Sequence, residues 1–120
     1  MEAAAEILGK LKSLSDPKNV VGMARFGINP AGTLGVSIPN LRKLSKEVGK
    51  DHKLARDLWN SGIHEAKILA SLVDDPALLT EKQMESWIAD FDSWDICDQV
   101  CSNLFDKTPL PHRKRLFDIF

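Results

Sequence analysis

The sequence of residues 64–73, HEAKILASLV, gives the clearest indication of the fold. Apolar side chains occupy most of its positions, which is more than the single stripe that a surface helix needs. We therefore expect a helix here that is buried on several sides. The segment Asp74-Asp75-Pro76 follows directly and should end this helix, because proline interrupts the backbone hydrogen bonds of a helix.

Amphipathic patterns recur on both sides of this segment, about every dozen residues. Apolar residues repeat at helical spacing, and no run alternates apolar and polar residues as a strand would. The pattern predicts further helices over residues 2–14, 17–26, 38–48, 52–62, 81–91, 93–105 and from 111 onward, with a loop over 27–35. The expected fold class is therefore all-α.

Short polar signals mark several of these helix ends. Ser37 and Asp51 suit the N-cap position, where a side-chain oxygen accepts a free backbone N–H. Gly49 suits a C-cap because glycine readily adopts positive φ. Thr80 and Gln83 fit the capping box that begins a helix.

Short helices joined by tight turns predict antiparallel pairs that pack side by side. The pairs would cover about 39–62, 63–91 and 93–120. Each pair would bury one face on its neighbour, as the helices of an α-solenoid do. An irregular helical bundle is the alternative.

Composition limits the class of protein. The 120 residues suffice for one domain, with 16 basic and 17 acidic side chains and a net charge of −1. Residues 1–60 hold 10 basic and 6 acidic residues, whereas residues 61–120 hold 6 and 11. No apolar run is long enough for a membrane span, and no secretory signal is recognisable, so we expect a cytoplasmic protein without membrane attachment.

The chain contains two cysteines. Cys97 and Cys101 stand four residues apart, which suits two small buried thiols better than a disulfide or a zinc site.

The last predicted helix is strongly apolar and has no terminal cap. We therefore expect residues 1–120 to be one helical domain, the N-terminal half of a longer protein. A second copy could instead cover the apolar face, giving a homodimer; that face consists of Leu116, Phe117, Ile119 and Phe120.

One predicted helix carries a candidate for chemistry. Steps of 100° from residue 93 to residue 105 group Ile96, Cys97, Val100, Cys101 and Leu104 into an apolar arc. The polar arc consists of Asp95, Gln99, Ser102 and Asn103. Trp94 and Asp98 fall together at the border. An indole face beside a carboxylate suits a cationic ligand, and a simple packing pair is the alternative.

Basic residues form two further candidates. Arg42, Lys43, Lys46 and Lys50 share one helical arc that could contact phosphates, although a solvated helix face would show the same pattern. Arg113 and Lys114 lie in a basic run at the start of the last helix, where a nearby polyanion would offset the unfavourable helix dipole. His64 lies beside Glu65 and is expected to make a local polar contact rather than to act as a base.

Several ordered segments resemble the DNA alkylation repair family, bacterial glycosylases built from HEAT-like helical repeats. These are GVSIPNLR (35–42), WNSGIHEAKILA (59–70), FDSWDICD (91–98), NLF (103–105) and KTP (107–109). The resemblance implies a HEAT-like α-solenoid that excises positively charged N3- or N7-alkylated purines from double-stranded DNA. It also implies that Trp94 faces the cation, that Asp98 stabilises an oxocarbenium-like transition state, and that no metal or organic cofactor is needed.

The sequence also departs from that family. Its enzymes use an arginine and further aromatic residues on later helices, and these helices are missing from the 120 residues. The chain also contains no tyrosine. A non-catalytic HEAT-like module that binds nucleic-acid backbone or a protein partner is therefore the alternative function.

Overall fold

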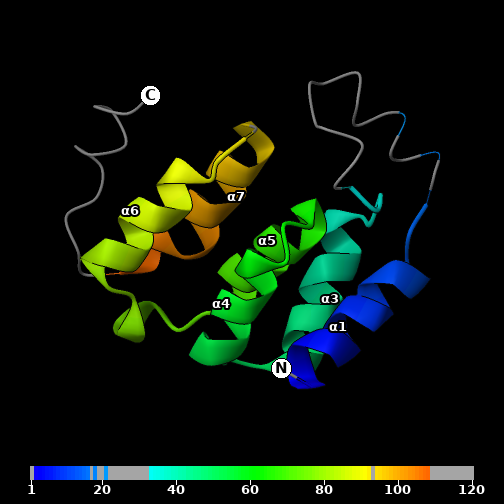
Figure 1. Cartoon of the computed structure of the whole chain (residues 1–120), viewed down its shortest axis with the longest axis horizontal. Coiled ribbons are helices and arrows are strands. Elements are labelled where there is room, and N and C mark those ends of the chain that lie inside the picture. Colours follow the sequence, from blue (N-terminus) through cyan, green and yellow to red (C-terminus); the bar gives the residue numbers. More distant parts are fainter. Residues whose placement is uncertain (1, 17, 19–20, 22–32, 93, 109–120) are drawn as a thin grey trace.

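The computed structural model describes residues 2–16, 18, 21, 33–92 and 94–108. The regular structure among these residues is entirely helical, which confirms the predicted fold class (Figure 1). The α-helices are α1 (Glu2–Ser13), α3 (Ile38–Val48), α4 (His52–Asn60), α5 (His64–Val73), α6 (Glu81–Ala89) and α7 (Trp94–Asn103). Two short 3₁₀-helices, η2 (Pro76–Leu78) and η3 (Phe105–Lys107), complete the described part.

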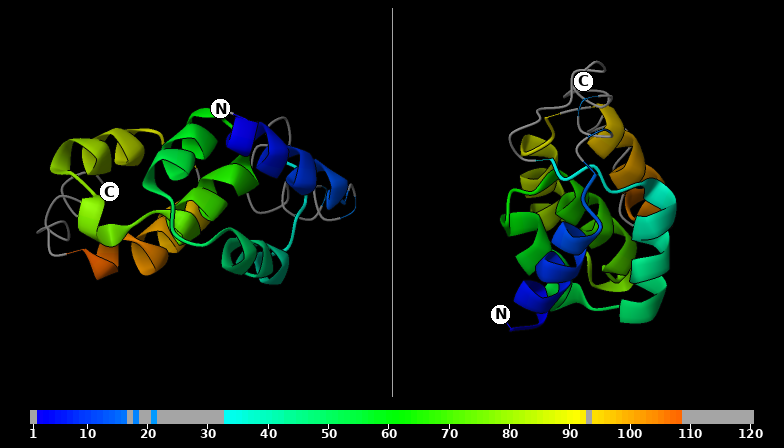
Figure 2. Two further views of the ribbon diagram at one scale, coloured as in Figure 1. Left: turned by 90° about the horizontal axis from the view of Figure 1, so that it is seen from below. Right: turned by 90° about the vertical axis from the view of Figure 1, so that its right-hand side faces the viewer.

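The helices lie in two layers (Figure 2, left). One layer contains α3, α5 and α7 in that order, and α5 packs on both of the others. The other layer contains α1, α4 and α6, and α4 packs closely on α5. This arrangement is compatible with an α-solenoid. No helix in the described ranges is both long and apolar enough to cross a membrane.

The predicted pairings of residues 39–62 and 63–91 are both wrong, because neither α3 with α4 nor α5 with α6 forms a closely packed pair. α3 and α4 each pack mainly on α5 rather than on each other. The linker between α3 and α4 is held at the end of α5, because the Lys50 Nζ donates to the Leu72 carbonyl (2.9 Å) and the Asp51 N–H donates to the Val73 carbonyl (2.7 Å). These two bonds direct α3 and α4 to different faces of α5.

α5 is the centre of the core, as its sequence predicts. Nine of its ten residues are buried, and only Leu72 is partly exposed. Ile68, Leu69 and Ala70 are almost completely shielded from solvent. Helices contact α5 from several sides, so its burial follows from packing rather than from a single amphipathic stripe.

A buried carboxylate fixes the segment that enters α3. Glu65 is fully buried and accepts the backbone N–H groups of Leu34 (2.9 Å), Gly35 (2.6 Å) and Val36 (3.1 Å). Gly35 has a φ of 81°, a conformation that glycine adopts without strain. Charge-assisted bonds offset the cost of burying the carboxylate and tie the start of α3 to the start of α5.

Aromatic stacking joins α4 to α6. The rings of Trp59 and Trp87 are parallel within 2°, and their centroids lie 4.1 Å apart. The Trp59 indole N–H donates to Asp90 (2.9 Å), and the Lys67 ammonium lies 5.5 Å from the Trp59 ring centroid. Two of the three tryptophans therefore serve the core, unlike Trp94.

A histidine–aspartate contact links α4 to the end of α5. The His52 Nδ1 lies 2.6 Å from the Asp74 Oδ1, and Asp74 is fully buried. The other Asp74 oxygen accepts the Gln83 side-chain N–H (2.7 Å) from α6. This contact lies at the opposite end of α5 from His64.

The predicted N-caps and the predicted C-cap are confirmed, but Gln83 does not complete a capping box, because its side-chain N–H donates to Asp74. The side chains of Ser37, Asp51 and Thr80 accept the N–H groups of Asn40, Leu54 and Gln83, respectively, and Gly49 has a φ of 78°. The helices predicted over 2–14, 52–62, 81–91 and 93–105 end earlier, at Ser13, Asn60, Ala89 and Asn103. The predicted helix from 111 onward, its apolar face and the homodimer based on it lie outside the described residues, as does most of the helix predicted over 17–26.

Candidate nucleic-acid interface

Trp94 and Asp98 project together from α7. Trp94 is the first residue of the helix and is 68% exposed, and Asp98 is exposed one turn later. Side chains at positions i and i+4 of a helix are neighbours on its surface. A broad indole face and a carboxylate are therefore available to the same ligand.

The predicted border position of this pair is wrong, because the exposed arc of α7 is rotated from the expected one. Asn103, expected in the polar arc, is only 6% exposed, and Cys101 is half-buried. The Asn103 amide donates to the Ser71 Oγ on α5 (3.2 Å), so the buried face includes this polar residue. Trp94 and Asp98 consequently lie within the exposed arc rather than beside the core.

The first turn of α7 is tied to the first turn of α5. The His64 Nε2 lies 2.8 Å from the Asp95 Oδ2, and His64 is only 5% exposed. The expected local contact of His64 with Glu65 is therefore wrong, because its partner is Asp95, 31 residues away. This partner follows from packing and has no signal in the local sequence.

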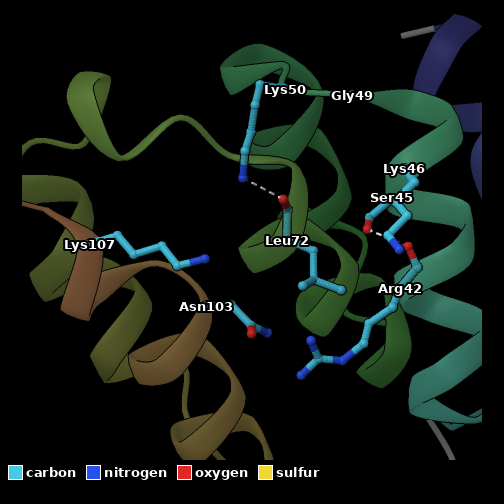
Figure 3. Close-up of a pocket in the computed structure, with 8 residues that line it drawn as sticks. All are labelled: Arg42, Ser45, Lys46, Gly49, Lys50, Leu72, Asn103 and Lys107. Carbon is cyan, nitrogen blue, oxygen red and sulfur yellow. Dashed lines mark hydrogen bonds between the residues drawn. The ribbon is translucent and has the colours of Figure 1, made fainter.

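A basic groove of about 400 Å³ lies where the C-terminal ends of α3, α5 and α7 meet (Figure 3). Arg42 and Lys107 extend into the groove from opposite sides. The lining residues are Arg42, Ser45, Lys46, Gly49, Lys50, Leu72, Asn103 and Lys107. Four cationic side chains without a lining acid suit a polyanion such as a nucleic-acid backbone.

The structure divides the basic residues proposed from the sequence. Arg42 and Lys46 line the basic groove together with Lys50. Lys43 instead lines a smaller depression of about 250 Å³ between α1 and α3, together with Lys10 and Glu47. Arg113 and Lys114 lie outside the described residues. Lys107 was not singled out by sequence reasoning, since it lies far along the chain from the other groove residues and follows α7.

The cysteines behave as packed thiols, as predicted. Cys97 is buried, Cys101 is half-buried, and both are free. Burial raises the pKa of both thiols, that of Cys101 to about 12, and the neighbouring Asp98 carboxylate adds to both increases. Such thiols are poor nucleophiles at neutral pH. Within the described ranges, no three histidine, cysteine or acidic side chains gather in a way that could hold a metal ion.

Comparison with known families assigns the chain. The model of the DNA alkylation repair enzyme family matches residues 7–118, nearly the whole sequence. Neither a curated protein nor a solved structure matched the chain. The family description indicates a role in DNA alkylation repair, and hence DNA as the substrate class. The chain therefore belongs to the DNA alkylation repair enzyme family.

Proposed function

We propose that this protein is a DNA glycosylase that hydrolyses the bond between deoxyribose and a positively charged N3- or N7-alkylated purine in double-stranded DNA. Asp98 is the catalytic carboxylate, and Trp94 faces the cation. The observation that carries the proposal is the joint exposure of these two side chains within the exposed arc of α7. We further propose that the protein acts in the cytoplasm.

The chemistry matches these two side chains. When the C1′–N bond breaks, its electron pair stays with the purine, which leaves as a neutral base. The sugar acquires oxocarbenium character, which a carboxylate stabilises, and the electron-rich indole attracts the cationic lesion. Water then adds its oxygen to C1′ and loses a proton, which Asp98 can accept.

The basic groove would hold the DNA backbone while α7 meets the lesion. Arg42, Lys46, Lys50 and Lys107 supply its positive charge, and the Lys50 ammonium keeps donors beyond the one used by the Leu72 carbonyl. The exposed face of α7 instead carries carboxylates, which repel phosphates. This separation of charge favours backbone binding at the groove and cation binding at Trp94 and Asp98.

The decisive experiment measures release of methylated purines from alkylated duplex DNA. The whole protein is compared with Asp98→Asn and with Asp92→Asn, a matched control that removes an exposed carboxylate close to α7. We expect full release by the wild-type protein and by the control, and release at least about 100-fold slower by Asp98→Asn. Full release by folded Asp98→Asn would contradict the assigned role.

The basic groove also supports a second candidate function. Its cations do not depend on Trp94 or Asp98, so a non-catalytic module could bind nucleic-acid backbone through the groove alone. That function predicts salt-sensitive DNA binding without base release. Binding without release by the intact, folded protein would favour this module over the glycosylase.

A further inference from the structure

We propose that His64 is a positioning residue, which acts through Asp95 to orient Trp94 and Asp98. This inference rests on the proposed function of those two side chains. The carrying observation is the 2.8 Å contact between the His64 Nε2 and the Asp95 Oδ2, which joins the first turns of α5 and α7. Asp95 is the neighbour of Trp94 and lies three residues before Asp98.

The His64–Asp95 contact restrains the first turn of α7, which carries Trp94, whereas the Asn103–Ser71 bond restrains its last turn. Buried apolar residues such as Ile96 and Val100 hold α7 in the core, but apolar contacts have little directional preference. A roll of about 10° would move a side-chain tip at about 5–6 Å from the helix axis by about 1 Å. A misplacement of that size at a reacting group can lower a rate about 100-fold. A hydrogen bond is directional and resists this roll.

The α5 end of the tether is itself firmly held. His64 is nearly buried, and the next residue, Glu65, is fixed by three backbone N–H groups from residues 34–36. Asp95 is one-third exposed and bonds across to α5, which turns its carboxylate toward that helix. The rigid helix thus sets the rotation of the helix that carries the proposed site.

His52 supplies a matched control for His64. It makes the same kind of contact, 2.6 Å from the Asp74 Oδ1, but the partners belong to the other end of α5. Loss of either histidine should lower stability. Only loss of His64 should disturb Trp94 and Asp98.

The test uses His64→Ala, His64→Gln, Asp95→Asn and His52→Ala. The single-turnover excision rate is measured with enzyme in saturating excess, and the Kd for alkylated duplex is measured separately. We expect His64→Ala to lower the rate at least about 10-fold with little change in Kd. His64→Gln should restore most of the rate, because its amide N–H can reach the position of the histidine Nε2. His52→Ala should excise at the wild-type rate below its unfolding temperature.

A second readout does not depend on activity. In protein labelled with 5-fluorotryptophan, the ¹⁹F resonance of Trp94 is identified by its loss in Trp94→Phe. We expect this resonance to shift in His64→Ala and Asp95→Asn, to return in His64→Gln, and to stay unchanged in His52→Ala. If His64→Ala does not fold, the Trp94 resonance is compared between Asp95→Asn and His64→Gln. We expect it to be shifted in Asp95→Asn and to lie at the wild-type position in His64→Gln.

The outcomes separate this inference from the proposed function. If the wild-type protein excises and His64→Ala and Asp95→Asn excise at the same rate, the positioning role is overturned and the proposed function stands. Equal losses in folded His64→Ala and His52→Ala would also overturn it, because they indicate a general structural effect. Without wild-type excision the proposed glycosylase fails, and the Trp94 resonance decides whether His64 still orients α7.

Discussion

α5 and α7 are ten-residue helices of the same layer, but they differ in how much of their surface is buried. α5 buries nine residues, including a histidine, a glutamate and a lysine that find polar or aromatic partners. α7 buries only part of its surface and exposes an indole and a carboxylate. α5 therefore contributes mainly to stability, whereas α7 presents the side chains of the proposed site to solvent. Substitutions on the two helices should therefore separate folding from function.

The largest expected effect is on activity, from Asp98→Asn in α7. Loss of the carboxylate should lower excision by about 100- to 1,000-fold, the range typical for removal of a group that stabilises transition-state charge. The free energy of unfolding should change by less than about 0.5 kcal/mol, because the side chain is exposed. Excision assays and thermal unfolding check both parts. A large loss of stability would show that Asp98 belongs to the scaffold instead.

A substitution in α5 should mainly affect stability. Leu69→Ala should lower the free energy of unfolding by about 2–5 kcal/mol, because it leaves a cavity in a fully buried site. Leu72→Ala, on the same helix but partly exposed, is the matched control and should cost clearly less. Urea unfolding followed by circular dichroism measures both. Similar costs for the two leucines would contradict the burial contrast within α5.

Substitutions of Trp94 test whether the indole on α7 contacts the cationic lesion. Trp94→Ala should weaken recognition of a cationic lesion by about 1–2 kcal/mol, whereas Trp94→Phe should retain part of the aromatic attraction. Competition binding between alkylated and undamaged duplex measures this preference. Unfolding should be nearly unchanged in both variants. If alanine and phenylalanine affect binding equally, the indole face does not contact the cation.

The basic groove can be tested by salt dependence. Each of Arg42→Ala and Lys107→Ala should reduce the slope of log K against log salt concentration by about one, because each removes one phosphate contact. Lys43→Ala is the control from the same helix as Arg42 but outside the groove, and its slope should change less. Fluorescence anisotropy with duplex DNA gives the slopes. An equal effect of Lys43→Ala would extend the DNA contact over the whole of α3.

The last comparison concerns the thiols of α7, Cys97 and Cys101. The thiolate is the reactive form, and burial raises the pKa of Cys101 from 9.0 to about 12. Its thiolate fraction at pH 8 is therefore very low and rises with pH up to that pKa. We expect modification by a disulfide reagent at least about 100-fold more slowly than in the unfolded chain. Rapid reaction of both native thiols at pH 8 would show that this part of α7 opens readily.

Much of the fold could be predicted because helix formation and capping involve neighbouring residues. The caps at Ser37, Asp51 and Thr80 each bond a backbone N–H three residues along the chain. The arrangement of helices was harder, because packing of α3 on α5 depends on contacts between distant segments, such as the bond from Lys50 to Leu72. For the same reason the rotation of α7, and with it the burial of Asn103, could not be read from its helical periodicity.

The all-helical class, the central burial of residues 64–73 and the neighbouring positions of Trp94 and Asp98 could all be predicted from the amino-acid sequence. These follow from local backbone geometry and side-chain spacing. Three features follow instead from the packing of the helices: Lys107 and Arg42 share one groove, Lys43 lies outside it, and His64 contacts Asp95. The physical reason is that these contacts join residues more than 30 positions apart, and the packing of whole helices determines which side chains meet.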